Sequence, residues 1–69
     1  MTRVLLGVRG MDHEAAVQKV TRALLAVPGV ARVSATADEQ ASVEYDATEV
    51  TVMELIRALR RIGFLAGME

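Results

Sequence analysis

The 69-residue sequence contains no cysteine. This excludes disulfide bonds, a thiolate nucleophile and any metal site built from thiolates, although oxidising and reducing compartments both tolerate a cysteine-free chain. The sequence also has only one histidine, His13, and its pattern places no serine or threonine beside this histidine as a nucleophile. Because no catalytic triad can be assembled from these residues, we expect that the protein is not an enzyme.

Long apolar runs and an excess of positive charge are also missing. A membrane-spanning helix needs roughly 20 apolar residues, and charged residues such as Arg9, Asp12 and Lys19 interrupt each window of that length. The apolar run near the N-terminus is far shorter than the core of a secretory signal. The net charge is −1, whereas a domain that neutralises nucleic-acid phosphates is normally basic. We therefore expect a cytoplasmic protein that neither inserts into membranes nor binds nucleic acid.

Apolar residues, in contrast, are abundant. They make up 52% of the chain, and acidic and basic residues nearly balance, so the sequence has enough apolar surface to fold. A chain of this length can enclose only one hydrophobic core. We expect residues 1–69 to form a single domain.

The spacing of the apolar residues predicts the secondary structure of the first two thirds of the chain. Residues 3–8 alternate in polarity with a period of two, which predicts a strand. From Ala15 the apolar positions follow one helical face, and the pair Pro28-Gly29 ends that helix. Residues 30–45 alternate again on both sides of a polar interruption, which predicts a β-hairpin.

The remaining residues predict a second helix and a final strand. Thr51 and Glu54 have the spacing of a capping box and mark the start of the helix, and Gly63 marks its end. Residues 64–68 then form a short strand. The order βαββαβ predicts an α+β ferredoxin-like sandwich, in which two helices cover one face of a four-stranded antiparallel sheet.

Several short motifs resemble a known family. They are Val8 to Met11, the turn Val27-Pro28-Gly29-Val30, Val33, the segment Val43-Glu44-Tyr45-Asp46 and Ile62-Gly63-Phe64. Together they resemble the heavy-metal-associated domain of copper chaperones, mercury-binding proteins and metal-pumping ATPases. The resemblance spans nearly the whole chain. It implies a ferredoxin-like fold, a role in metal binding or trafficking, and a metal-transporting ATPase or another metal-handling protein as partner.

The metal loop departs from the pattern of this family. There, Gly-Met is followed after one residue by Cys-x-x-Cys, and the two cysteine positions are His13 and Ala16 here. The remaining candidate ligands are His13, Asp12 and Glu14, an imidazole between two carboxylates, which suits Zn(II), Ni(II) or Co(II) better than Cu(I). In zinc pumps of the family an aspartate often precedes the first cysteine and takes part in binding. Asp12 stands at that position.

These three residues also have structural interpretations. Asp12 is a good N-cap for the first helix, Glu14 is an acid that suits a first helical turn, and His13 is then merely exposed. Sequential residues point in diverging directions, so one loop rarely supplies three ligands. The alternative hypothesis is a degenerate domain that binds no metal and acts as a protein-interaction or regulatory module. It would use its sheet or its basic helical face, which consists of Lys19, Arg22, Arg57, Arg60 and Arg61.

Two hydrophobic residues are expected near the metal loop, with Met11 buried beneath it and Phe64 packed in the core or shielding the site.

Two other families share the strand order. RNA-recognition motifs are unlike this sequence, because the outward positions of the first and third strands carry no aromatic residue for base stacking. ACT-type regulatory domains remain an alternative, although Gly10-Met11-Asp12-His13 lacks their proline-glycine start.

Overall fold

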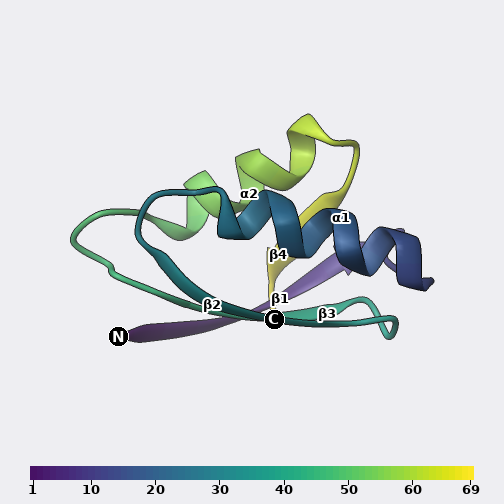
Figure 1. The fold of residues 1–69 in the computed structure, drawn as a ribbon, viewed down its shortest axis with the longest axis horizontal. Helices are drawn as coiled ribbons and strands as arrows, with labels where there is room; N and C mark the ends of the chain where they lie inside the picture. Colours follow the sequence, from purple (N-terminus) through teal and green to yellow (C-terminus); the bar gives the residue numbers. More distant parts are fainter.

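The computed structural model describes residues 1–69 as two helices on one face of a four-stranded sheet (Figure 1). The elements are β1 (Thr2–Arg9), α1 (Glu14–Leu25), β2 (Val30–Thr36), β3 (Gln40–Tyr45), α2 (Val52–Arg61) and β4 (Leu65–Met68). The strand order is β2-β3-β1-β4, and all neighbouring strands are antiparallel. This confirms the predicted ferredoxin-like βαββαβ fold, with the ends of some elements shifted by a few residues.

The centre of the sheet is formed by β1 and β3. Directly opposite residues of an antiparallel pair lie on the same face, and here Leu6 pairs with Ala41 and Val4 with Val43. These four side chains are buried. The alternation seen in the sequence therefore places the branched side chains of β1 toward the helices and its other residues on the open face.

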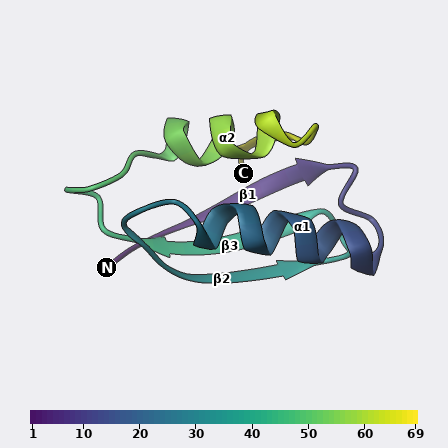
Figure 2. The same cartoon turned by 45° about the horizontal axis from the view of Figure 1, so that its top comes forward.

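Both helices contribute one apolar face to the same core. Ala16, Val20 and Leu24 of α1 follow each other at intervals of four residues, and all are buried, as are Leu55 and Leu59 of α2. Figure 2 shows the two helices on the same side of the sheet. None of the helices is long and apolar enough to span a membrane.

The start of α2 follows the sequence prediction. Thr51 is the N-cap, and its hydroxyl accepts a hydrogen bond from the backbone N–H of Glu54 at 3.4 Å. Gly63 has a φ of 90°, a backbone conformation that glycine adopts readily, just after the helix ends. The predicted signals for the start and the end of this helix are thus confirmed.

Candidate functional site

The loop of residues 10–13 joins β1 to α1 and carries two of the three candidate ligands. Gly10 has a φ of 94°, which turns the chain away from β1 in a way that other residues rarely adopt. The side chain of Met11 is fully buried in the core, and its backbone N–H donates to the carbonyl of Val8 at 3.4 Å. The predicted packing of Met11 beneath the loop is therefore confirmed, and this residue anchors the loop to the core.

Two residues from distant parts of the chain contact Gly10. The backbone N–H of Gly10 donates to Oε2 of Glu39 at 2.7 Å. A Cβ atom built on Gly10 would lie 3.6 Å from Cδ1 of Phe64, so the aromatic ring lies against the loop while it also packs on the core. In Figure 2, the loop, the β2–β3 turn and the end of α2 lie at the same end of the molecule. Both expected roles of Phe64 are compatible with this position.

Asp12 and His13 form an exposed pair. Nδ1 of His13 lies 2.9 Å from Oδ1 of Asp12, and their side chains are 64% and 71% exposed, respectively. When Nδ1 carries the proton of a neutral ring, it donates to the carboxylate and leaves Nε2 with a free lone pair. The hydrogen bond with His13 is the largest cause that lowers the pKa of Asp12 below its usual value, and the backbone N–H of Asp12 and the charge of His13 act in the same direction.

The interpretation of Asp12 as the N-cap of the first helix is wrong. Because α1 begins at Glu14, the N-cap is His13, which has an extended backbone (φ −152°, ψ 163°) and makes no capping hydrogen bond with its side chain. Asp12 is one residue too early to cap the helix, and its carboxylate binds the imidazole instead. Glu14 lies in the first turn, where an acid suits the helix dipole.

The donor atoms around this loop do not form a complete metal site. No group of three or more His, Cys, Asp or Glu side chains in the structure lies close enough together to hold a metal ion. The structure thus brings Asp12 and His13 together but does not bring Glu14 into a three-ligand group with them. The second cysteine position of the family, Ala16, is buried in the core at 2% exposure. This donor set does not fit Cu(I) or Hg(II), and it fits a borderline divalent ion only as a partial site.

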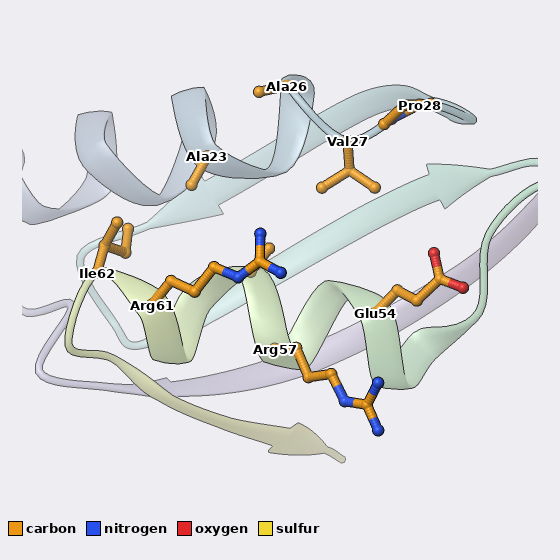
Figure 3. A pocket seen from close by; sticks show the side chains of 9 residues that line it. Ala23, Ala26, Val27, Pro28, Glu54, Arg57, Arg61 and Ile62 are labelled. Carbon is orange, nitrogen blue, oxygen red and sulfur yellow. The ribbon is translucent and has the colours of Figure 1, made fainter.

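A second surface feature lies between the two helices. A hollow of ≈ 570 Å³ is lined by alanines of both helices and by charged side chains of α2 (Figure 3). Arg57 and Arg61 lie beside it, and Lys19 and Arg22 line an adjoining hollow. The ion pairs of the protein are Arg3 with Glu44 and Asp12 with His13. None of the five cations of the basic helical face is therefore paired within the chain.

Comparisons with known proteins agree with the observed fold. The sequence matches the model of the heavy-metal-associated domain over residues 5–64. No curated protein sequence matches the chain. Among solved structures, oxidized MerP from Ralstonia metallidurans CH34 is 30% identical with a TM-score of 0.95, and the match covers 99% of this chain and 96% of that chain.

Two further structures are similar over almost their full lengths. A copper binding domain from HMA7, a P-type ATPase, is 28% identical with a TM-score of 0.96, and the match covers 100% of this chain and 95% of that chain. The CopZ metallochaperone is 27% identical with a TM-score of 0.90, and the match covers 96% of this chain and 100% of that chain.

Proposed function

Because the chain belongs to the heavy-metal-associated domain family, we propose that it binds and transfers a divalent metal ion through a site without thiolates. The ligand that matters most in this proposal is His13, assisted by Asp12. The supporting observation is the exposed pair of these residues, 2.9 Å apart, at the end of a loop that Met11 anchors to the core. Imidazole and carboxylate donors favour Zn(II), Ni(II) or Co(II) over Cu(I). The proposed role is non-enzymatic and cytoplasmic.

The two ligand residues have different roles in this proposal. Histidine ligands of metals usually donate their second ring N–H to a carboxylate or carbonyl, which orients the imidazole. The bond between Nδ1 of His13 and Asp12 is of this kind and leaves Nε2 for the metal. Asp12 acts either as this orienting group or as a second ligand, and Glu14 stays a prediction as the third.

The proposal includes a partner that completes the coordination sphere. Zinc usually takes four ligands, and residues 12–14 offer at most three in sequence. Water or the donor groups of a second protein must fill the remaining positions. A metal-transporting ATPase or another metal-handling protein is the partner that suits this role, because an incomplete and exposed ligand set allows ligands to be exchanged one at a time.

The test is a titration of the protein with Zn(II), Ni(II), Co(II) and Cu(I), in which two-dimensional amide NMR spectra are recorded at each step. We expect localised, saturable shifts at residues 11–15 and at Phe64 with a divalent ion, and their loss in His13→Ala. Binding should weaken in acid, because protons compete with the metal for the lone pair of an imidazole. Unchanged binding by His13→Ala would contradict the proposal.

Carboxylate variants separate the roles of the acids. Asp12→Asn keeps an oxygen that can accept from the imidazole but is a poor metal ligand, so it weakens binding strongly only if Asp12 binds the metal directly. Glu14→Gln tests the third ligand in the same way. Glu49→Gln is the matched control, because Glu49 is an exposed acid in the loop before α2.

A second candidate function is a metal-free interaction module. It is favoured by the five unpaired cations of the basic helical face, two of which border the hollow between the helices. In this case no metal ion changes the NMR spectrum. Changing Arg57 and Arg61 together to glutamate should then weaken binding to the partner by removing an attraction to acidic groups. Unaltered affinity would exclude this face as the contact surface.

A further inference from the structure

The turn between β2 and β3 contains an unusual backbone conformation. It consists of residues 37–39, and its last residue, Glu39, has a φ of 63°. Glu39 is the only residue other than glycine with a positive φ in the protein. Three-residue hairpin loops often require this left-handed conformation at their last position, which glycine and asparagine adopt most readily. Glutamate is therefore a costly choice for the turn itself.

The side chain of Glu39 acts outside its own turn. Its carboxylate accepts a hydrogen bond of 2.7 Å from the backbone N–H of Gly10, 29 residues away in the sequence. Its backbone carbonyl accepts a second bond, of 2.8 Å, from the N–H of Val8. Hydrogen bonds to ionised acceptors are shorter and stronger than neutral ones. Glu39 therefore holds the chain on both sides of Arg9, where β1 ends and the loop begins.

This contact is one of three that fix the start of the loop. The side chain of Met11 lies in the core, the ring of Phe64 lies against Gly10, and Glu39 binds the Gly10 N–H. The side chains of Asp12 and His13 have only each other as hydrogen-bond partners. Their position thus depends on how firmly the preceding backbone is held.

We propose that Glu39 is a positioning residue, whose carboxylate orders the loop and thereby presents Asp12 and His13 for binding. Its role in metal affinity rests on the proposed function, whereas its role in ordering the loop does not. A site with few ligands is especially sensitive to this ordering, because any disorder that remains must be removed at the expense of binding energy. The contact of Glu39 with Gly10 thus offsets the backbone cost of a glutamate at this turn position.

The test compares two substitutions that differ in side chain and backbone preference. Glu39→Gly suits the left-handed turn but removes the carboxylate, so we expect no loss of thermal stability, while solvent exchange of the Gly10 amide becomes about tenfold faster. Metal affinity should fall at least about threefold if loop order is lost. Glu39→Gln keeps an acceptor of the same length and should stay within about threefold of the wild type in both properties. Asp38→Asn, a change in the same turn, is the control.

Each outcome supports or overturns the proposal. Faster Gly10 exchange in Glu39→Gly with weaker metal binding and unreduced stability supports it. Unchanged exchange overturns it, and so does an increase in exchange that merely follows a loss of global stability. Faster exchange with unchanged metal affinity overturns the role of Glu39 in metal binding. If the wild-type protein binds no metal, the proposed function fails, and the exchange rates alone then decide the role of Glu39 in ordering the loop.

Discussion

The two strand-to-helix loops of the protein hold their backbones in different ways. In the loop before α2, the carboxylate of Asp46 accepts from the backbone N–H and the hydroxyl of Thr48 at 2.9 and 2.6 Å. The hydroxyl of Thr51 then caps the helix through the N–H of Glu54. The polar side chains of this loop thus satisfy part of its own backbone, while the backbone N–H of Asp46 donates to the carbonyl of the distant Gly29 at 2.8 Å.

The loop before α1 has no such internal support. Its acid, Asp12, pairs with His13 instead of with a backbone N–H at the helix start, and the loop is held by the distant residues Glu39 and Phe64 and by its buried residue Met11. Both loops follow a strand and precede a helix, but their acids differ: Asp46 of the second loop is bound to Thr48, whereas Asp12 of the first loop is bound to an exposed imidazole. This exposed pair of an imidazole and a carboxylate is the reason for choosing the first loop as the candidate site.

Removing the buried side chain of Met11, which anchors the first loop, should have the largest effect on stability. Met11→Ala leaves a cavity in the core, and we expect it to lower the free energy of unfolding by about 2–5 kcal/mol. Met53→Ala, at a methionine that is 57% exposed, is the matched control and should change it by less than about 0.5 kcal/mol. Urea denaturation measures both values. Equal effects of the two substitutions would show that Met11 is not the anchor.

If Met11→Ala does not fold, a folded Met11→Leu would show that the volume lost from the core is the cause. Leucine has nearly the volume of methionine, so this variant should fold and lose less than about 1.5 kcal/mol.

The backbone of the first loop should tolerate a side chain poorly. Gly10→Ala places a Cβ at a φ of 94°, which should lower stability by about 1–2 kcal/mol because of strain between the Cβ and the backbone. Each kcal/mol corresponds to roughly 4–8 °C in the melting temperature of a domain of this size. Gly67→Ala is the control, because no atom lies within 4 Å of its Cβ position and its φ is not positive. A shift as small as that of the control would contradict the prediction.

The two N-caps should respond differently to substitution by alanine. Thr51→Ala removes a capping hydrogen bond and should lower stability by about 1 kcal/mol. His13→Ala removes no capping bond, so its effect should be below about 0.5 kcal/mol. Thermal unfolding of both variants provides the measurement. A larger loss in His13→Ala than in Thr51→Ala would reverse the comparison between the loops.

The features that could be predicted from the sequence are those that depend on neighbouring residues. Alternation at Val4, Leu6 and Val8 predicted the inner face of β1, and Thr51 with Glu54 predicted the start of α2. These signals are local, because a strand has a period of two and a cap acts over three residues. They were sufficient to predict the fold.

The candidate site could be predicted only in part. The sequence pointed to Asp12 and His13 as candidate ligands, but it did not show that their side chains bind each other, which depends on side-chain rotation. It also gave no indication of Glu39, because the bond to Gly10 joins residues 29 positions apart. The one available signal was weak, namely a glutamate at a hairpin position that favours glycine or asparagine. Contacts between distant loops follow from the assembled fold.

The smallest expected effect concerns the pKa values of Asp12 and Asp46, the acids of the two loops. The pKa of Asp46 is lowered chiefly by its hydrogen bond with the Thr48 hydroxyl, and that of Asp12 by its bond with His13. A carboxyl group whose pKa is lower in the folded protein contributes stability that is fully present above its unfolded pKa, about 3.9. This contribution is lost as the pH falls through the lowered value.

A substitution in one loop should therefore change the pKa of the acid in that loop only. Thr48→Val should raise the pKa of Asp46 only in part, because the backbone N–H of Thr48 still donates to it. His13→Ala removes the hydrogen bond that chiefly lowers the pKa of Asp12, so this pKa should move closer to its usual value. Carboxyl ¹³C shifts followed from about pH 6 to pH 2 measure both midpoints across the usual range. Each variant is the control for the other, since a change in both midpoints would mean that the two loops are coupled rather than independent.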